Sequence, residues 1–284
     1  MKQKILVLGS SSWLGSALLN RLSLSTYQLI STVFRTQVEF NFDIEIVKAE
    51  SLKDYQDILK SYNPEVIVNF LRGENEEDYD IHKNFINYCS ATNSHYIYAS
   101  SALALDAYDN VDLTEHILAK SVSEYGLFKG NCEQMLYDSK ICWSILRFSS
   151  LQGYCAHKFT RNESFLNRLH KGEDIYIDSG VYQNRMFVDD MILIVEKIIE
   201  DKINGIIHIG TIDTSEEIDF LRKQANLFGY SSDRVKSNGN IRNVNLNCKP
   251  KTILELSDGS FKVTEEDTLK RINSIKEFDK YRKT

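Results

Sequence analysis

The sequence predicts an α/β protein with a doubly wound parallel sheet and a smaller C-terminal subdomain. Short apolar runs typical of buried strands alternate with helical segments at intervals of about 30 residues, which is the pattern of βαβ units. The first run, residues 4–8, leads through a glycine turn directly into a helical segment. The runs 66–70 and 96–99 are rich in β-branched and aromatic residues, which indicates strands buried on both faces.

Composition and charge narrow the class of protein. The chain has 284 residues, 42% of them hydrophobic and 26% charged, with a net charge of −6 and a pI near 5.6. No long basic block is present, which argues against nucleic-acid binding, and no apolar run is long enough to span a membrane. The N-terminus enters a strand without a signal-peptide pattern, so we expect a cytoplasmic protein. The five cysteines are scattered, and we expect neither a disulfide framework nor a metal site.

The N-terminal turn is a candidate phosphate site. Strand 4–8 ends at Gly9, and a helix is predicted over 16–24, so backbone N–H groups at the helix N-terminus favour an anion. The spacing Gly9-x-x-Ser12-x-x-Gly15 places a serine where the dinucleotide fingerprint has its middle glycine. The added Cβ and hydroxyl of Ser12 predict a looser or slightly redirected approach of the pyrophosphate.

Arg35 follows the second predicted strand, residues 28–34. An acidic residue at this position would hold the ribose 2′-hydroxyl of NAD, whereas a cation suits the 2′-phosphate of NADP. Arg35 therefore favours NADP, and the alternative is a solvated arginine at a strand end.

The remaining elements follow in order. Residues 74–80 are expected to form an acidic, solvated loop, and Ser215 is expected to cap the helix that follows it. The final part of the chain is expected to form a small, partly separate subdomain with a charged terminal helix. Strands are predicted at 44–47, 143–148, 175–177 and 205–210, and helices at 52–61, 79–92, 159–171, 191–200 and 215–228.

The stretch 95–133 carries the candidate chemistry. A strand ends in Ser100-Ser101, and the helix predicted after residue 121 places Tyr125 and Lys129 on one face. A hydroxyl at a strand end that faces a Tyr–Lys pair can transfer a proton beside a carbonyl.

The same Tyr–Lys spacing recurs at Tyr79 and Tyr154, where a half-buried aromatic beside an extended lysine is the simpler reading. Tyr125 differs because a strand ending in serine precedes it and the glycine motif stands at the N-terminus.

Eight segments, in order along nearly the whole chain, resemble the extended short-chain dehydrogenase/reductases. Within them the chain is most similar to the dTDP-4-dehydrorhamnose reductase-like branch and the neighbouring sugar-nucleotide epimerases. The segments are Gly9 to Gly15, Asn63-Pro64-Glu65-Val66-Ile67-Val68-Asn69, Ser100-Ser101, Tyr125-Gly126-x-x-Lys129-x-x-x-Glu133, Arg147-Phe148 to Gly153, Phe187-Val188-Asp189-Asp190, Gly205-Ile206-Ile207-His208 and Lys249-Pro250-Lys251.

This resemblance implies a Rossmann domain over 1–154, to which 186–210 return, and a substrate-binding subdomain formed by 155–185 and 211–284. It implies reduction of a keto group on a nucleotide-activated sugar with NADPH, with NADH or bound NAD as alternatives, in polysaccharide biosynthesis. A homodimer through the helices flanking the sheet is expected from the resemblance alone.

The resemblance also implies functional residues. The catalytic set is Ser101, Tyr125 and Lys129. The cofactor-binding set adds Gly9, Ser11, Ser12, Trp13, Leu14, Gly15, Arg35, Glu50, Phe70 and Leu71 to Tyr125 and Lys129. The substrate-binding set is Asn84, Ser101, Lys158, Arg161 and Arg185, of which the three cations are candidates for the diphosphate.

Two departures limit the assignment. Ala102-Leu103 replace the acidic pair that follows the catalytic hydroxyl in dehydratases and the Asp-Tyr of rhamnose-type reductases. Epimerases often have an arginine where this chain has Gln183, with Arg185 two residues later. The alternatives are an NAD-dependent epimerase and a nucleotide-binding regulatory subunit without catalysis.

Overall fold

The computed structural model describes residues 2–34, 39–108, 113–257 and 259–283. Two compact units are formed, each from several segments of the chain. Unit 1 comprises Met1–Ala104, Leu118–Arg147 and Ile192–Ile207, and unit 2 comprises Leu105–Ile117, Phe148–Met191 and His208–Thr284. The predicted Rossmann domain extended further along the chain, to residue 154, and included 105–117.

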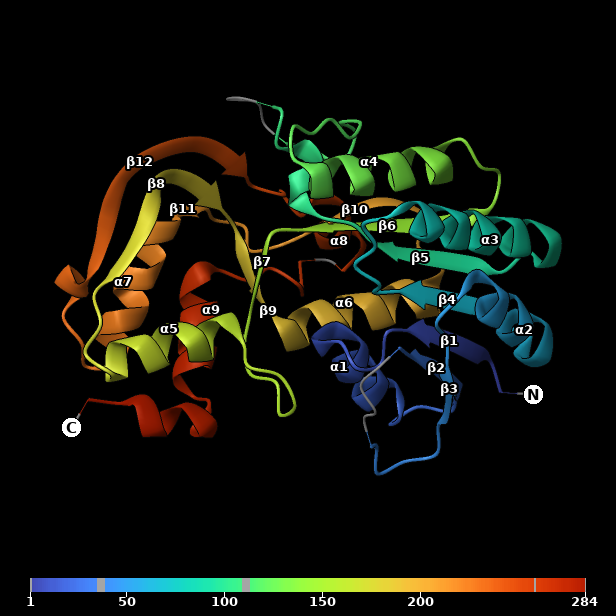
Figure 1. Ribbon diagram of the computed structural model, residues 1–284, viewed down its shortest axis with the longest axis horizontal. Helices are drawn as coiled ribbons and strands as arrows, with labels where there is room; N and C mark the ends of the chain where they lie inside the picture. Colours follow the sequence, from blue (N-terminus) through green and yellow to red (C-terminus); the bar gives the residue numbers. More distant parts are fainter. Residues whose placement is uncertain (1, 35–38, 109–112, 258, 284) are drawn as a thin grey trace. The chain divides into compact units, whose positions relative to one another are not determined.

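A seven-stranded sheet with the order β10-β6-β5-β4-β1-β2-β3 forms the centre of unit 1 (Figure 1). The registers of β1 with β2 and β4, of β2 with β3, and of β5 with β4 and β6 are all parallel. The predicted doubly wound α/β fold is therefore confirmed. The strands are β1 Lys4–Leu8, β2 Gln28–Val33, β3 Glu45–Lys48, β4 Val66–Asn69, β5 His95–Ala99, β6 Cys142–Phe148 and β10 Gly205–Ile209.

Helices cover both faces of this sheet (Figure 1). On one face, α2, α3 and α4 bury side chains such as Ile58, Phe85 and Leu136 in a core shared with the strands. On the other, α1 is joined to α6 by the ion pair of Arg21 with Glu196 at 2.7 Å. The helices are α1 Trp13–Leu22, α2 Leu52–Tyr62, α3 Glu76–Thr92, α4 Glu124–Tyr137 and α6 Val188–Asp201, and the 3₁₀ helix η1 spans Ala102–Leu105.

The acidic segment 74–80 was wrongly predicted as a loop, because α3 begins at Glu76. Asn75 caps α3 by accepting from the Asp78 N–H, and the Asp78 carboxylate accepts from the Asn75 N–H in return. Carboxylates in a first turn are stabilised by the helix dipole and this capping box, so the acidic run starts the helix.

Unit 2 contains a three-stranded sheet, β11-β8-β12, and a two-stranded pair, β7-β9. The sequence predicted only the start of β8 and missed β12, whose polar stretch has two register shifts and a glycine with φ of +87°. The strands are β7 Ser150–Gln152, β8 Ile175–Gln183, β9 Arg185–Phe187, β11 Ser215–Glu216 and β12 Val235–Leu246. The helices are α5 Arg161–His170, α7 Glu217–Leu227, α8 Lys251–Leu256 and α9 Glu265–Asn273, with 3₁₀ helices η2 Ser232–Arg234 and η3 Lys276–Tyr281.

Ser215 does not cap α7, contrary to the prediction. Ser215 lies in β11, and α7 begins at Glu217 after Glu216 without a side-chain cap. The Ser215 hydroxyl instead contacts Arg185 at 2.9 Å and donates to the Glu265 carboxylate. The Ser215 hydroxyl is therefore bound in a buried ion cluster and does not cap α7.

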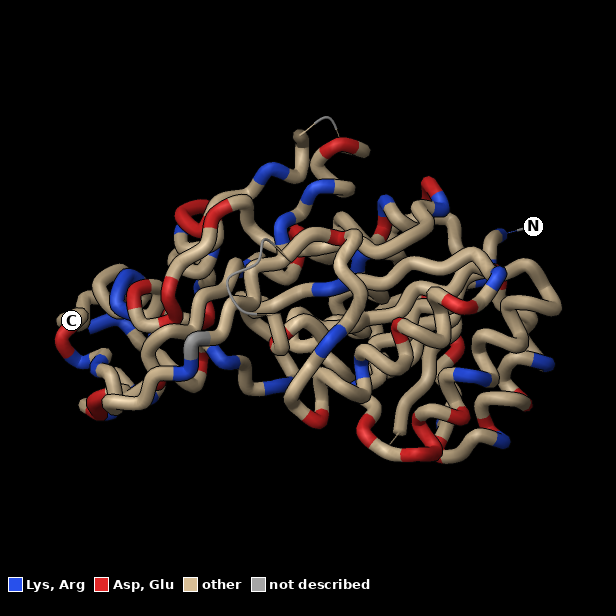
Figure 2. Tube along the Cα trace, turned by 90° about the horizontal axis from the view of Figure 1, so that it is seen from above, with Lys and Arg blue, Asp and Glu red and all other residues tan. Residues whose placement is uncertain are grey.

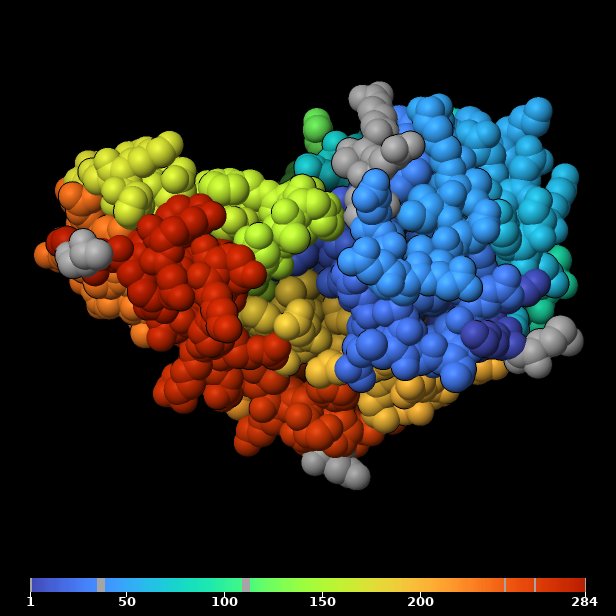
Figure 3. Space-filling view, turned by 90° about the horizontal axis from the view of Figure 1, so that it is seen from below, coloured from blue at the N-terminus to red at the C-terminus, as the bar shows by residue number. Residues whose placement is uncertain are grey.

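The C-terminal 3₁₀ helix η3 packs beside α5 within unit 2. In Figure 3 the red end of the chain lies next to the yellow-green residues of α5. The rings of Tyr154 and Phe278 are 6.0 Å apart, and those of His170 and Tyr281 are 6.2 Å apart. These contacts tie the end of the chain to the helix that carries Arg161.

Candidate active site

The N-terminal glycine turn brings the end of β1 against the start of α1. Gly9 has a φ of +86°, which favours glycine, and a Cβ on Gly15 would lie 2.1 Å from the Gly9 carbonyl oxygen. The Ser12 hydroxyl caps α1 by accepting from the Gly15 N–H at 3.0 Å. Two of the three fingerprint positions therefore require glycine here, and Ser12 supplies a helix cap instead.

The other predicted cofactor residues fall into three groups. Ser11, Trp13 and Leu14 are half-buried at the start of α1, where N–H groups point out of the helix end. Phe70 and Leu71 follow β4 directly, and the Leu71 side chain lies 3.5 Å from a Cβ built on Gly9. Glu50 is exposed after β3 and pairs with Lys48 at 2.9 Å, whereas Arg35 lies outside the described residues.

Tyr125 and Lys129 lie on the first turns of α4, which Ser123 caps. Gly126 allows α4 to approach η1, because a Cβ there would lie 2.2 Å from the Leu103 carbonyl oxygen. Ser101 stands between β5 and η1, and its hydroxyl accepts from the Leu103 N–H at 3.2 Å. The predicted catalytic residues thus come from two segments that pack closely within unit 1.

The Lys129 ammonium is held by two backbone carbonyls. It donates to Ala99 O at 2.9 Å, at the end of β5, and to Leu71 O at 3.2 Å, just after β4. It also lies 4.7 Å from the centre of the Tyr98 ring and 5.7 Å from that of Tyr125. Burial lowers the Lys129 pKa to about 8, because desolvation penalises the charged form more than nearby anions support it.

Burial raises the pKa of Tyr125, which therefore carries its proton at neutral pH. Arg72 opposes this shift and Glu74 adds to it. The Arg72 guanidinium lies 5.5 Å from the centre of the Tyr125 ring and pairs with Glu74 at 2.5 Å. The contact of Arg72 with Tyr125 was not predicted from the sequence. The position of Arg72 just after the end of β4, beside Phe70 and Leu71, could have indicated it.

A buried ion pair anchors α4 to the sheet. Arg147 on β6 binds the Glu133 carboxylate with Nε at 3.0 and 3.1 Å and Nη2 at 2.5 Å. The Ser100 hydroxyl donates to the same carboxylate. Glu133 lies one turn after Lys129, so this cluster fixes the helix that carries the Tyr–Lys pair.

The predicted substrate residues differ in burial and in their partners. Asn84 is half-buried in the middle of α3, and its Nδ2 has no hydrogen-bond partner in the described structure. Lys158 is exposed before α5, and Arg161, at the first position of α5, has a side chain 75% exposed. Arg185 is fully buried and pairs with Glu217 at 2.8 Å and with Glu265 at 3.0 Å.

Arg185, predicted as a diphosphate ligand, is enclosed by groups of unit 2. Its guanidinium also donates to Gln183 O at 3.1 Å and stacks 4.2 Å from the centre of the Phe220 ring. Two carboxylates already balance its charge, whereas its buried Nε finds no hydrogen-bond partner among the described residues. A role for Arg185 at the diphosphate stays a prediction.

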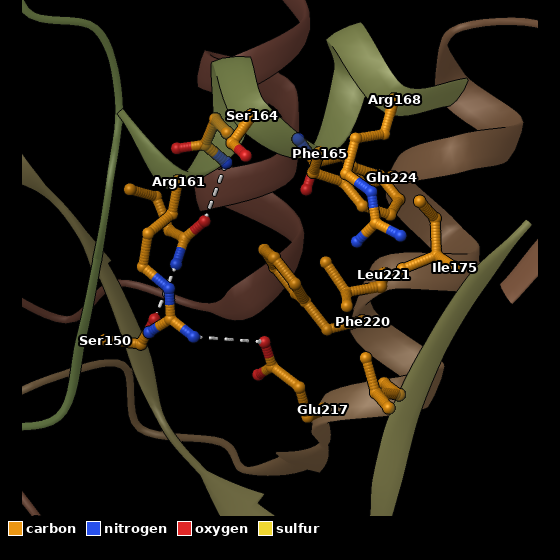
Figure 4. Close-up of a pocket in the computed structure, with 13 residues that line it drawn as sticks. Ser150, Arg161, Ser164, Phe165, Arg168, Ile175, Glu217, Phe220, Leu221 and Gln224 are labelled. Atoms are coloured by element: carbon orange, nitrogen blue, oxygen red, sulfur yellow. Dashed lines mark hydrogen bonds and ion pairs between the residues drawn. The ribbon is translucent and has the colours of Figure 1, made fainter. Parts of the chain in front are cut away.

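A pocket of about 210 Å³ in unit 2 lies between α5, α7 and β8 (Figure 4). Arg161 points across it to Glu217, 4.0 Å away, and Arg168 lines the other side. Phe165 and Phe220 form apolar walls, and the remaining lining residues are Ser150, Gln152, Asn162, Ser164, Ile175, Ile177, Leu221 and Gln224. The pocket combines cationic groups with aromatic surface, which suits an anionic ligand that carries a ring.

Comparison with known proteins identifies the class. The solved structure of dTDP-glucose 4,6-dehydratase from Bacillus anthracis str. Ames in complex with NAD matches with a TM-score of 0.81 at 16% identity, covering 95% of each chain. dTDP-4-dehydrorhamnose reductase of the same organism in complex with NADP matches with a TM-score of 0.75 at 17% identity, covering 96% of this chain and 99% of that one. UDP-N-acetylglucosamine 4-epimerase from Bacillus cereus matches with a TM-score of 0.74 at 21% identity, covering 96% and 98%. These likenesses show that the chain shares the fold of these three enzymes.

The family model described as RmlD substrate binding domain matches residues 3–250. The chain therefore belongs to that family, and the resemblance drawn from the sequence is confirmed. No curated protein matches the sequence. Within the described residues, no helix is long and apolar enough to cross a membrane, and no three His, Cys, Asp or Glu side chains are grouped to hold a metal ion. Figure 2 shows basic and acidic residues interspersed along the trace.

Proposed function

We propose that the protein is an NAD(P)H-dependent reductase of a keto group on a nucleotide-activated sugar. The observation that carries this proposal is the Tyr125–Lys129 pair. Tyr125 is protonated, and the centre of its ring lies 5.7 Å from the buried ammonium of Lys129. A reduction needs an acid that protonates the forming alkoxide, and a tyrosine whose pKa is raised by burial is in the required state at neutral pH.

Three residues divide the work at the carbonyl. Tyr125 donates its proton to the substrate oxygen, and Ser101 donates a hydrogen bond to the same oxygen. Lys129 stabilises the tyrosinate that remains, because a positive charge in a buried site favours the ionised phenol. A second cation, Arg72, lies on the Tyr125 ring and acts in the same direction.

The turn at Gly9 and the N-terminus of α1 fit a dinucleotide cofactor. Gly15 leaves no space for a side chain, and the helix end presents N–H groups to a pyrophosphate. The cofactor supplies the hydride. Lys129 would hold the nicotinamide ribose of the bound cofactor, because an ammonium has three donors and two of them go to Ala99 O and Leu71 O. The choice of NADPH rests on the identity of Arg35 alone.

The pocket of unit 2 is the proposed site of the nucleotide diphosphate. Arg161 provides the charge, and Ser150 provides a hydroxyl. Arg168 adds charge on the other side of the pocket, although it also pairs with Glu173 at 2.8 Å. Phe165 offers an aromatic face to the base. A diphosphate would compete with Glu217 for Arg161, whose ion pair is long at 4.0 Å and therefore weak.

The segment after Ser101 favours a reductase over a dehydratase. Ala102, Ala104 and Leu105 are at most 1% exposed in η1, so this turn presents no carboxyl group for proton transfer. An epimerase that reoxidises its own product with tightly held NAD uses the same Tyr–Lys pair, and it stays the second candidate.

The test is a titration with NADPH and NADH, read by nicotinamide fluorescence, followed by turnover of dTDP- and UDP-linked 4-keto sugars. Tyr125→Phe should lower kcat by about 10²–10⁴-fold and leave cofactor affinity nearly unchanged, as expected for loss of a general acid. Tyr154→Phe, which alters a tyrosine followed by a lysine at the same spacing, is the matched control and should keep full activity.

NAD that remains bound after purification would favour the epimerase. Full turnover by Tyr125→Phe would refute the acid–base assignment, and binding of neither cofactor would refute the oxidoreductase.

A further inference from the structure

A series of hydrogen bonds in unit 1 joins α3, β5, β4 and α4, and the backbone of α4 closes it into a circuit. Its polar side chains are Asn69, His82 and Tyr96, which are 4%, 2% and 0% exposed. None of them has a role in the proposed chemistry. Buried polar groups cost free energy unless every donor and acceptor finds a partner, so a circuit of this kind calls for an explanation.

The direction of each bond at His82 follows from its partners. His82 Nε2 lies 3.0 Å from Cys132 O, which can only accept, so Nε2 carries the hydrogen. Burial, reinforced by the charge of Lys129, lowers the His82 pKa to about 4 and keeps the ring neutral. Nδ1 therefore accepts, and its donor at 2.9 Å is the hydroxyl of Tyr96.

The circuit continues from Tyr96 back to the catalytic helix. The Tyr96 oxygen accepts from Asn69 Nδ2 at 2.7 Å, and Asn69 Oδ1 accepts from the Leu71 N–H at 2.9 Å. The Leu71 carbonyl then accepts from Lys129 Nζ at 3.2 Å. Lys129 lies three residues before Cys132 on α4, where the circuit began, so the path closes.

We propose that His82 is a positioning residue for Lys129. It fixes the hydroxyl of Tyr96, which orients the Asn69 amide. The Asn69 amide oxygen in turn holds the N–H of Leu71, the residue whose carbonyl is one of the two that bind the ammonium. The steps are hydrogen bonds between these groups, joined through the backbone of Leu71, so a change at His82 reaches Lys129 through bonds and not only through packing. The consequence for catalysis rests on the proposed function, because that proposal gives Lys129 its role.

A second buried histidine provides a matched control. His95 at the start of β5 is also 2% exposed, and burial lowers its pKa to about 4 as well. Its Nε2 lies 2.7 Å from the Ser144 hydroxyl, in a contact with no link to Leu71 or Lys129. His82→Leu and His95→Leu therefore remove comparable groups, and only the first opens the circuit.

The primary measurement is amide hydrogen exchange of the Leu71 N–H, which needs no substrate or cofactor. His82→Leu should accelerate this exchange by about tenfold or more, because the Asn69 amide loses its orientation. Tyr96→Phe, which removes one hydroxyl, should accelerate Leu71 exchange as well. This variant replaces His82→Leu in the test if His82→Leu does not fold. His95→Leu should leave Leu71 exchange unchanged. His82→Asn, which retains an acceptor near the position of Nδ1, should restore most of the protection.

The second measurement is the dissociation constant of NADPH. If Lys129 is displaced, His82→Leu should weaken binding by about tenfold, and His95→Leu should not. Unchanged Leu71 exchange in both His82→Leu and Tyr96→Phe would refute the circuit. Faster exchange with unchanged NADPH affinity and kcat would refute the positioning role. If the wild-type protein bound neither nucleotide, the proposed function would fail, while the exchange data would still decide the circuit.

Discussion

Two fully buried arginines, one in each unit, show how differently the same side chain can be used. Arg147 in unit 1 binds the carboxylate of Glu133 in a compact contact through Nε and Nη2. Arg185 in unit 2 faces two carboxylates, from α7 and α9, and an aromatic ring. The first joins α4 to the sheet, and the second joins two helices to β9.

Lys129 is also a buried cation, and its partners differ from those of the two arginines. Both arginines have carboxylate partners within 3.0 Å, whereas the partners of Lys129 among the described residues are two carbonyl oxygens and aromatic rings. Burial without a carboxylate partner destabilises the charge, and the Lys129 pKa falls to about 8. The two buried cations with carboxylate partners hold the structure, and the one without a carboxylate partner is the one proposed to stabilise the tyrosinate of Tyr125.

The largest effect is expected from breaking the pair in unit 1. Arg147→Met leaves the Glu133 carboxylate buried without its cation, which should lower the free energy of unfolding by about 3–5 kcal/mol. Urea unfolding of the wild type and the variant measures this. The double variant Arg147→Met/Glu133→Leu should recover part of the loss, because it removes the stranded charge. A loss below about 1 kcal/mol in the single variant would show that the pair is not isolated from water.

The pH dependence of stability should separate Lys129 from the arginines. The folded-state pKa of about 8 lies below the value of 10.5 for a free lysine, so the unfolded chain binds this proton more tightly. Stability should therefore rise with pH between about 8 and 10.5, by about 1.4 kcal/mol per pH unit and about 3 kcal/mol in total. The difference in free energy of unfolding between the wild type and Lys129→Met, measured across that range, isolates this term. A flat difference would contradict the lowered pKa.

Arg185→Met tests whether the second arginine binds substrate. The variant leaves Glu217 and Glu265 in place, but Lys223 already lies 2.8 Å from Glu265 and offsets part of the stranded charge. We expect a loss of about 3 kcal/mol in stability, at the lower end for a broken buried pair. Binding of dTDP or UDP by the folded variant should be unchanged. A loss of nucleotide affinity of tenfold or more would show that Arg185 takes part in substrate binding.

The fold could be predicted because its signals are local. Apolar runs such as residues 4–8 and 66–70 become strands wherever they are buried on both faces, and β1 occupies the predicted residues. β12 could not be predicted, because its residues are polar and it forms a strand only by pairing with β8 over an irregular register. Ser215 was misassigned for a similar reason, since its hydroxyl is taken by groups distant in the sequence.

The site was predictable only in part. The residue types and spacing of Tyr125 and Lys129 indicate the chemistry, and the structure brings them together on α4. Whether a cation is free depends on its neighbours in space, which spacing does not reveal. Arg185 and Arg161 were equivalent candidates from the sequence, yet one is 0% and the other 75% exposed at the side chain.

Arg161→Met is the smallest predicted change and sharpens the contrast with Arg185. Because the side chain is mostly exposed and its contact with Glu217 is 4.0 Å long, stability should hardly change. Affinity for dTDP or UDP should fall about tenfold, since a charge-assisted bond to a phosphate is worth more than 1 kcal/mol. Arg222→Met, on α7 and outside the pocket, is the control and should leave the affinity unchanged, although it loses the hydrogen bond from Arg222 Nε to Val235 O at 3.2 Å. Isothermal titration at two salt concentrations gives the answer, because a phosphate contact makes affinity salt-dependent. Equal affinities of Arg161→Met and Arg222→Met would place the diphosphate elsewhere.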